Sequence, residues 1–199
     1  MKFPEIYLAS ASPRRHEILT QLAVPHEVLG LPPVAGEDEP HLEGESPADY
    51  VLRTARDKAQ RALEYLSGDG AGLWQPRPVL TADTIVILGQ DILGKPGSRE
   101  EARSMLERLS GNEHEVRTAV VLATPERMME DVSVTTVRFA QLHPADIEAY
   151  CASGEPMDKA GAYGIQGLAG LFVEHISGSF SGVMGLPVYE TGKLLRRLL

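Results

Sequence analysis

The stretch VLTADTIVIL, residues 79–88, decides the fold class. It is almost continuously apolar and rich in β-branched residues, which is typical of a strand buried on both faces of a sheet. One aspartate, Asp83, interrupts it. Burying a lone carboxylate is costly unless it is paired or binds a metal. We therefore expect Asp83 to be a metal ligand or a general base; a structural carboxylate that caps a neighbouring loop is the alternative.

Upstream of this strand, the sequence alternates strands and helices. Residues 6–8 are a short apolar strand, and Pro13 stands where the first turn of a helix tolerates proline. A short strand over residues 26–29 leads into a loop rich in proline, glycine and glutamate. Ser46 followed by Pro47 then predicts the start of a long helix, to about residue 66, with an apolar stripe along one side.

Downstream, the pattern predicts three more helices and three more strands. One helix begins at Ser98 and ends at Gly111, a second runs from Pro144 to about residue 152, and the C-terminal helix begins at Pro187. Residues 114–124 and 132–142 are expected to be an antiparallel pair of strands, and residues 171–176 a third strand. Residues 154–170 are expected to be a long functional loop. Since no internal repeat or composition break divides the chain, we expect a single α/β domain over residues 1–199 with a mixed sheet.

The overall composition excludes several classes of protein. The 199 residues are 43% hydrophobic and 24% charged, as in ordinary globular domains. A net charge of −9 argues against general nucleic-acid binding, which needs a basic surface. No stretch approaches about 18 consecutive apolar residues, so we expect no membrane span. The N-terminus lacks a secretory apolar run, and the single Cys151 makes no internal disulfide; both favour a cytoplasmic location.

The segment SASPRR, residues 10–15, places hydroxyl groups and two arginines at the start of a helix. Helix N-termini bind anions and disfavour cations, because they carry unpaired N–H groups and the positive end of the helix dipole. A bound phosphate would explain Arg14 and Arg15, since guanidinium groups hold phosphate oxygens bidentately. The alternative is two solvated surface arginines beside a serine cap.

Two lysines and an acidic loop are further candidates. Lys58 borders the apolar stripe of its helix, and Lys95 follows the buried strand in a Gly-Lys-Pro turn. Either can neutralise phosphate charge, although a lysine that only extends over apolar surface would look the same. The acidic run at residues 37–39 is a metal-ligand candidate or simply a solvated loop. The six histidines show no ligand spacing, so we do not expect a zinc site.

The segment EPMDKAGAYGIQG, residues 155–167, combines small residues with one aromatic and one amide side chain. This is a suitable lining for a base pocket; a glycine-rich surface loop without a ligand is the alternative. Asp158 and Lys159 within it are additional candidate site residues.

Taken together, these segments resemble the Maf family, the septum-formation-inhibitor-like nucleoside triphosphate pyrophosphatases. The matching stretches are LASASPRRHEIL, ARDKA, TADTIVILGQDILGKP, LSGNEHEVRTAVVL, GEPMDKAGAYGIQG and GSFSGVMGLPVYET, in order over nearly the whole chain. The resemblance implies a mixed, elongated central sheet with flanking helices and two lobes around a cleft, similar to inosine triphosphate pyrophosphatase. It also implies hydrolysis of a nucleoside triphosphate to the monophosphate and pyrophosphate, with Mg²⁺ or Mn²⁺.

The resemblance also assigns roles to individual residues. It places the family's catalytic aspartate on Asp83, which with Glu39 would also bind the metal; Asp38 or Glu37 are alternatives to Glu39 because loop lengths vary here. The phosphate-binding residues that it implies are Ser10, Arg14, Arg15, Lys58 and Lys95.

Within the family, the branch that acts on dTTP and UTP carries the motifs ADT and GIQG, found here at residues 82–84 and 164–167. The resemblance therefore implies dTTP and UTP as substrates, with modified pyrimidine nucleotides left open. It makes Arg14, Thr84 and Gln166 the positions that discriminate between bases.

The implied partners follow from this chemistry. We expect a nucleoside triphosphate substrate, no nucleic acid and no membrane, and the resemblance leaves room for a homodimer. Two other functions compete: a nucleotide-sensing regulator of cell division that does not hydrolyse its ligand, and a phosphatase of sugar or monoester phosphates.

Overall fold

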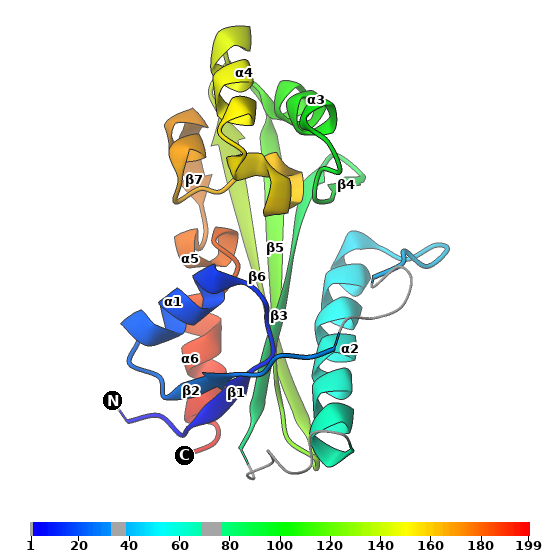
Figure 1. Ribbon diagram of the computed structural model, residues 1–199, viewed down its shortest axis with the longest axis vertical. Helices are drawn as coiled ribbons and strands as arrows, with labels where there is room; N and C mark the ends of the chain where they lie inside the picture. The colour runs from blue at the N-terminus through cyan, green and yellow to red at the C-terminus, as the bar shows by residue number, and fades with distance from the viewer. Residues whose placement is uncertain (1, 33–38, 69–76) are drawn as a thin grey trace. The chain divides into compact units, whose positions relative to one another are not determined.

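A computed structural model describes residues 2–32, 39–68 and 77–199 of the chain (Figure 1). They form two compact units, each discontinuous in sequence. The first unit comprises Met1–Asp83, Ala119–Val132 and Gly185–Leu199, and the second comprises Thr84–Thr118 and Ser133–Met184. The division into two units agrees with the expected two lobes. The expected single domain stays a prediction.

The strands form one mixed sheet, which confirms the predicted α/β class. Along the sheet the order is β2-β1-β3-β5-β6-β7, and β4 pairs with β3 off this path. β1 is parallel to both β2 and β3, whereas β4 is antiparallel to β3 and β7 is antiparallel to β6. The strands are β1 (Ile6–Leu8), β2 (His26–Val28), β3 (Val79–Leu88), β4 (Asp91–Leu93), β5 (Glu113–Ala123), β6 (Met128–Phe139) and β7 (Val173–Ser177).

The first unit follows the sequence pattern closely. α1 (Pro13–Gln21) begins at the expected proline, and α6 (Val188–Arg196) follows Pro187. α2 (Pro47–Ser67) is capped by Ser46, whose hydroxyl accepts a hydrogen bond from Asp49 N. Its apolar stripe lies against β3, where Thr81 Oγ1 donates to Ala55 O at 2.8 Å. This contact fixes one face of α2 against the strand that carries Asp83 (Figure 1).

The second unit has its own apolar core. α3 (Arg99–Leu109) is capped by Ser98, as predicted, and packs on α4 (Pro144–Ala152). The larger side chains of this core include Leu106, Phe139, Tyr163 and Phe172, all buried. The aromatic rings of Phe139, Tyr163 and Phe172 meet edge to face, the favoured geometry for such pairs. This core supports the segment expected to form the base pocket.

Two expectations about local structure were wrong, and two short elements were not predicted. Residues 154–170 are not one long loop, because three short 3₁₀ helices occupy most of this region: η2 (Glu155–Asp158), η3 (Ala160–Ala162) and η4 (Leu168–Phe172). β6 begins four residues earlier than expected, at Met128, because the strand continues through the polar Glu130 and Asp131. The sequence analysis also missed the three-residue β4 and α5 (Phe180–Val183), which are too short to show a period.

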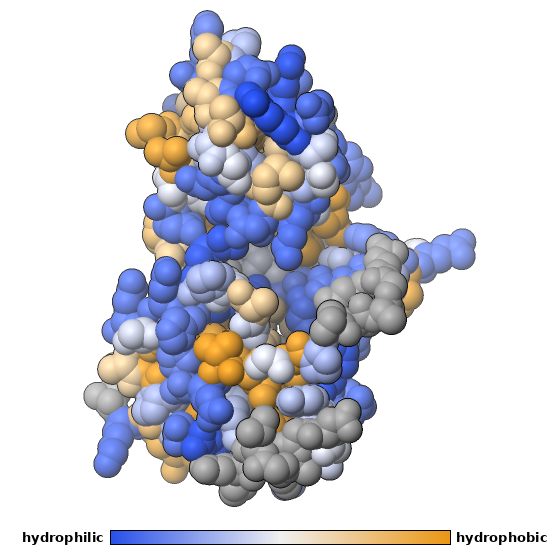
Figure 2. All heavy atoms as spheres, viewed as in Figure 1, coloured by the Kyte–Doolittle hydropathy of each residue, from blue (hydrophilic) through white to orange (hydrophobic). Residues whose placement is uncertain are grey.

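α3 has one buried apolar face and one exposed charged face. It buries Ala102, Leu106 and Leu109, whereas Arg99, Arg103 and other charged residues are exposed. Figure 2 shows this outer surface as hydrophilic. Within residues 2–32, 39–68 and 77–199, no helix is long and apolar enough to cross a membrane.

Candidate active site

Asp83 ends the first of the three segments that form the first unit, and both of its carboxylate oxygens accept hydrogen bonds from residues of that segment. Its side chain is buried, with 6% of the residue exposed. Oδ1 accepts from Lys58 Nζ at 2.7 Å, and Oδ2 accepts from Thr54 Oγ1 at 2.8 Å. Thr54 and Lys58 lie four residues apart on α2, so one face of that helix supplies both donors. The lone carboxylate predicted from the strand is therefore paired.

The surroundings of Asp83 keep its carboxylate ionised. Burial alone raises the pKa of a carboxyl group. Here the charge and hydrogen bond of Lys58 outweigh burial, with help from the charge of Arg15 and the hydrogen bond of Thr54, and the pKa of Asp83 lies below its usual value. Asp83 is thus a fixed negative charge at neutral pH.

Lys58 joins Asp83 to a second carboxylate. Its Nζ lies 2.5 Å from Glu39 Oε1 and 2.7 Å from Asp83 Oδ1. The two oxygens therefore converge on one position that already holds a positive charge. The Glu39 side chain is partly exposed and that of Lys58 less so. This confirms that Lys58 emerges at the edge of the core, as its place beside the apolar stripe indicated.

This pair of carboxylates fits a hard divalent cation. Two converging carboxylate oxygens, with no sulfur or imidazole, are the type of ligand that Mg²⁺ prefers, with water and substrate phosphates completing its shell. In the part of the chain that the structure describes, no three His, Cys, Asp or Glu side chains gather as a metal site. Among the described residues, Asp83 and Glu39 would therefore supply two ligands to a bound Mg²⁺, and water and substrate phosphates would supply the others.

Two side chains of α2, Tyr50 and Arg53, hold the segment that carries Glu39. Tyr50 donates its hydroxyl to Glu39 O at 3.1 Å, and its ring stacks on His41 with centroids 4.1 Å apart. Arg53 Nη2 donates to Pro40 O at 2.8 Å. Tyr50 and Arg53 both belong to α2, so the same helix orients Glu39 and Asp83. The alternatives Glu37 and Asp38 lie outside the described residues.

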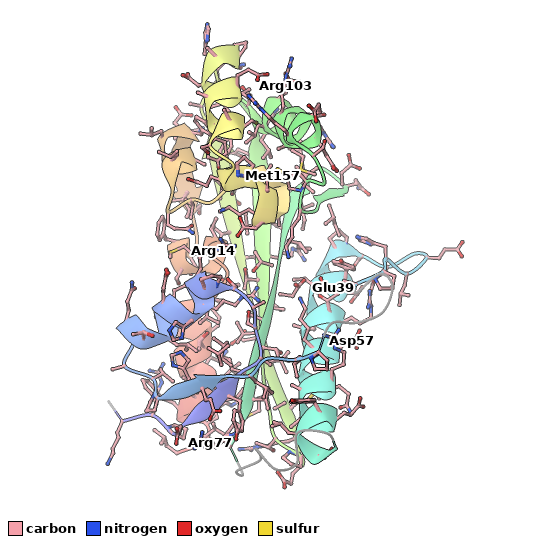
Figure 3. The ribbon with its side chains drawn as sticks, in the orientation of Figure 1. Arg14, Glu39, Asp57, Arg77, Arg103 and Met157 are labelled. Atoms are coloured by element: carbon pink, nitrogen blue, oxygen red, sulfur yellow. The ribbon has the colours of Figure 1, made fainter. Side chains whose placement is uncertain are left out.

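The arginines of α1 differ in their surroundings. Arg15 Nε donates to Gly185 O at 2.8 Å, and Arg15 Nη1 donates to Ser10 Oγ at 3.1 Å. Burial lowers the pKa of Arg15, although the charges of Asp83 and Glu39 counteract this. The solvated-surface alternative is therefore wrong for Arg15. Arg14 is half-buried on the first turn of the same helix (Figure 3).

The start of α1 has the character of an anion site. Its N-cap residue, Ser12, makes no side-chain capping bond, and the first turn contains no acidic residue. Ser10 Oγ accepts from Ser12 N at 3.3 Å as well as from Arg15. The N-terminal end of the helix dipole therefore faces hydroxyl and guanidinium groups rather than a carboxylate, which favours an external anion.

Two of the three candidates for base recognition, Thr84 and Gln166, belong to the second unit, whereas Arg14 belongs to the first. Thr84, the residue after Asp83 on β3, is half-buried, and its Oγ1 lies 2.9 Å from Thr118 Oγ1. Gln166 is exposed and follows the buried Ile165. The turn before Gln166 is tightly packed, because a Cβ on Gly164 would lie 2.8 Å from Lys159 Cε. The exposed amide therefore stands on a well-supported backbone.

The remaining candidates have less distinctive surroundings. Lys95 is exposed in a turn whose Gly94 carbonyl accepts from Gly161 N at 3.0 Å. Lys159 Nζ lies 2.5 Å from Asp158 Oδ1 and 2.5 Å from Glu155 O. Asp158 and Lys159 thus form a pair with each other. Nothing in their contacts adds to the role that was suggested for them.

The sequence analysis missed two contributors, Thr54 and Tyr50. Both are buried polar groups on the apolar side of α2. A threonine inside an apolar helix stripe, one turn before a lysine, is a usable signal, because a buried hydroxyl needs a partner. Tyr50 gives no such signal, since tyrosine is common in apolar stripes.

Comparison with known proteins identifies the family. The model of the family described as "Maf-like protein" matches residues 5–198. The chain belongs to this family. It is 58% identical to the dTTP/UTP pyrophosphatase of Bordetella avium, over 98% of this chain and 95% of that protein. It is 50% identical to the dTTP/UTP pyrophosphatase of Escherichia coli O6:K15:H31, over 96% of this chain and 91% of that protein.

A solved structure of the Staphylococcus aureus Ham1 protein matches with a TM-score of 0.42 and 13% identity, over 69% of this chain and 72% of that one. The family assignment depends on the sequence matches, which span nearly the full length of this chain and of the named relatives.

Proposed function

We propose that this protein is a nucleoside triphosphate pyrophosphatase that hydrolyses dTTP and UTP to the monophosphate and pyrophosphate. The observation that carries the proposal is the pairing of Asp83 and Glu39 on one cation position beside an arginine-bearing helix N-terminus. Family membership supports it, because relatives that are 48–58% identical are named dTTP/UTP pyrophosphatases.

The residues of the first unit would handle the phosphates. A triphosphate brings several negative charges to a protein of net charge −9, so local cations must offset them. Arg14, Arg15 and Lys58 supply such charges, and Ser10 adds a hydroxyl. Water attacks the α-phosphorus, the bond from that phosphorus to the bridging oxygen breaks, and pyrophosphate leaves. The proposed phosphate-binding role of Lys95, which is exposed, comes from the family resemblance alone.

A divalent metal, Mg²⁺ or Mn²⁺, is the cofactor that the family points to, with Glu39 and Asp83 as its protein ligands. When bound, it would lower the pKa of a water ligand and stabilise charge on phosphate oxygens. Lys58 already satisfies the same two carboxylates, so its ammonium group keeps them in place without metal.

The low pKa of Asp83 favours the ligand role over that of a general base. An effective general base has a pKa near the working pH, whereas the pKa of Asp83 is held below its usual value. We therefore propose that Asp83 acts mainly as an anchored negative charge and metal ligand. Replacing Thr54 by valine tests whether Asp83 must be ionised, as both roles require, because it removes a hydrogen bond that helps to lower the pKa. Activity should then fall at acidic pH while the rate near pH 8 changes little.

Thr84 and Gln166 of the second unit would read the base. A part for Arg14 in base discrimination comes from the family resemblance alone. A side-chain amide has a donor face and an acceptor face, which suits the imide edge of thymine and uracil, where N3–H lies between two carbonyl oxygens. Losing such a polar contact in a buried site costs about 1–3 kcal/mol. We therefore expect dTTP and UTP to react at least about tenfold faster than CTP, ATP or GTP.

One experiment tests both the reaction and its specificity. The purified protein is supplied with Mg²⁺ and each of dTTP, UTP, CTP, ATP and GTP, and pyrophosphate and orthophosphate are measured separately. Hydrolysis in ¹⁸O-water should place the label in the monophosphate, because the α-phosphorus is attacked. Label in the pyrophosphate would move the attack to the β-phosphorus. Equal rates for all bases would refute the assignment of Thr84 and Gln166.

The same measurements separate the competing functions. A nucleotide-sensing regulator would bind dTTP or UTP without releasing pyrophosphate, and a monoester phosphatase would release only orthophosphate. No contact among the described residues favours either of them over the pyrophosphatase.

A further inference from the structure

The hydroxyl groups of Thr84 and Thr118 form a chain of two hydrogen bonds that ends on the backbone carbonyl of Gly182 in the second unit. We call this chain the relay. Thr118 Oγ1 donates to Gly182 O at 2.7 Å and lies 2.9 Å from Thr84 Oγ1. A carbonyl oxygen only accepts, so the single proton of Thr118 is used there. The hydrogen bond between the two threonines therefore requires Thr84 to donate and Thr118 to accept.

The end of this relay is held firmly. Gly182 N donates to Ser179 Oγ at 3.0 Å, and Ser179 N donates to Thr135 Oγ1 at 2.9 Å. A Cβ on Gly182 would lie only 3.0 Å from Ser133 Oγ, so the backbone there packs directly on β6. Because these contacts come from neighbouring side chains, the Gly182 carbonyl has little freedom to turn away from Thr118.

Burial keeps water from changing which hydroxyl donates in these hydrogen bonds. Thr118 is 1% exposed, and Thr84 is half-buried. Water therefore does not compete for the proton of Thr118, and a buried hydrogen bond of this kind is costly to leave unmade. The Thr84 hydroxyl proton is directed into the protein, and what its oxygen can offer a ligand is acceptor capacity.

We propose that Thr118 is a positioning residue for base recognition, which turns the Thr84 hydroxyl so that Thr84, rather than the Gln166 amide oxygen, accepts the hydrogen bond from N3–H of uracil or thymine, while the Gln166 amide N–H donates to a base carbonyl. This inference rests on the proposed function, in which Thr84 contacts the base. N3–H is the only donor on the imide edge, whereas cytosine carries a lone pair at N3. An acceptor at Thr84 therefore suits UTP and dTTP and opposes the N3 lone pair of CTP.

The test removes the hydroxyl of Thr118 and keeps its shape. In Thr118→Val, the Thr84 hydroxyl loses its acceptor and can rotate to donate to N3 of cytosine. The ratio of kcat/KM for UTP to that for CTP should fall at least about tenfold, the scale of one neutral hydrogen bond. The ratio for dTTP to CTP should fall in parallel, because both preferred bases carry the same imide. Thr118→Ser keeps the hydroxyl and should keep both ratios.

A matched control comes from β3 itself. Thr81 is also a buried threonine that donates to a backbone carbonyl, Ala55 O, at 2.8 Å. Thr81→Val loses a buried donor of the same kind without touching the relay, so its UTP-to-CTP ratio should stay at the wild-type value. Thr118→Ala is measured beside Thr118→Val, and the comparison uses whichever variant keeps a cooperative thermal transition.

Each outcome decides a different point. Wild-type protein that hydrolyses CTP as fast as UTP would overturn the base preference of the proposed function, and this inference with it. A wild-type preference that survives both Thr118 variants would overturn only the inference. A ratio that rises in the variants would show that Thr84 faces the exocyclic group at position 4, where cytosine is the donor, and would overturn the assignment to N3.

Discussion

Asp83 combines burial with a charge, and its neighbours make that combination stable. Lys58 and Thr54 occupy both oxygens, so replacing the carboxylate by an amide changes the charge with little change in shape. We expect Asp83→Asn to stay folded, since Lys58 keeps Glu39 as a partner. Turnover of UTP should fall by at least about 100-fold, the scale for losing a catalytic acid-base or metal-binding group.

Asp131 offers a matched control for this change. It forms another aspartate–lysine pair of the first unit, with Lys193 Nζ at 2.7 Å, and its side chain is partly exposed. Asp131→Asn should leave turnover unchanged, because partly exposed ion pairs contribute little. Thermal melting and kcat are measured for both variants. Equal, small effects on kcat would return Asp83 to a structural role.

His114 is a second residue whose surroundings set its charge. It is buried beside Phe139 and Tyr163, and burial lowers the pKa of its imidazole from 6.5 to about 4. Between these pH values the unfolded chain binds the proton and the folded protein does not. The stabilisation from a neutral His114 is therefore complete above pH 6.5 and is lost as the pH falls towards 4, by up to about 3 kcal/mol.

Urea unfolding at pH 7 and pH 4.5 checks this prediction. His114→Gln keeps a polar group for the Tyr163 hydroxyl but does not titrate, so its free energy of unfolding should fall less over this range than that of the wild type. His175→Gln, at an exposed position of β7, should behave like the wild type. An equal acid-induced loss in all three proteins would contradict the prediction.

At the scale of elements, the sequence predicted the helices and strands that have a hydrophobic periodicity or a capping residue. β3 has the bounds that its apolar run indicated, and α1, α2 and α3 begin at the residues that Pro13, Ser46 and Ser98 marked. The sequence did not predict the 3₁₀ helices η2 to η4, because runs of three to five residues are held by tertiary contacts. One such contact is the hydrogen bond from Leu168 N to Glu155 Oε2. Such contacts between side chains and distant backbone leave no local pattern.

Variants of the two arginines of α1 distinguish a role in phosphate binding from a role in stability. Arg15→Ala loses the hydrogen bonds to Gly185 O and Ser10 Oγ, so it should lower the melting temperature as well as kcat/KM. Arg14→Ala should lower kcat/KM for UTP while the melting temperature stays constant or rises slightly, because a cation at a helix N-terminus is unfavourable. Arg14→Lys should restore only part of the activity, since lysine lacks the bidentate fork.

Melting temperature and kcat/KM are measured side by side for these three variants. If neither alanine variant changes kcat/KM more than a few-fold, α1 does not bind phosphate. If Arg15→Ala melts like the wild type, the hydrogen bonds of Arg15 to Gly185 O and Ser10 Oγ contribute little to the stability.

At the scale of the whole molecule, the full-length resemblance predicted the family and the residue types of the site. It did not predict which neighbours orient those residues. Lys58 was expected to bind phosphate, but its two carboxylate partners come from a loop and a strand that are far apart in the sequence. The Thr118 relay likewise joins β5 to β3 and to the turn at Gly182. Only the folded chain brings these hydroxyls and carboxylates into contact.

The last prediction concerns whether the two units fold as one domain. β3, β5 and β6 each contribute residues to both units, so unfolding one unit would strip hydrogen-bonding partners and apolar cover from strands that continue into the other. We therefore propose a single cooperative transition. Native-state hydrogen exchange measures it: the amides of Leu80 in the first unit and Val86 in the second, both buried on β3, should open with the same free energy, equal to that of global unfolding. An amide near the exposed C-terminus, such as that of Leu199, should exchange much faster. If Val86 opens at a clearly lower free energy than Leu80, the second unit unfolds separately and the chain contains two domains.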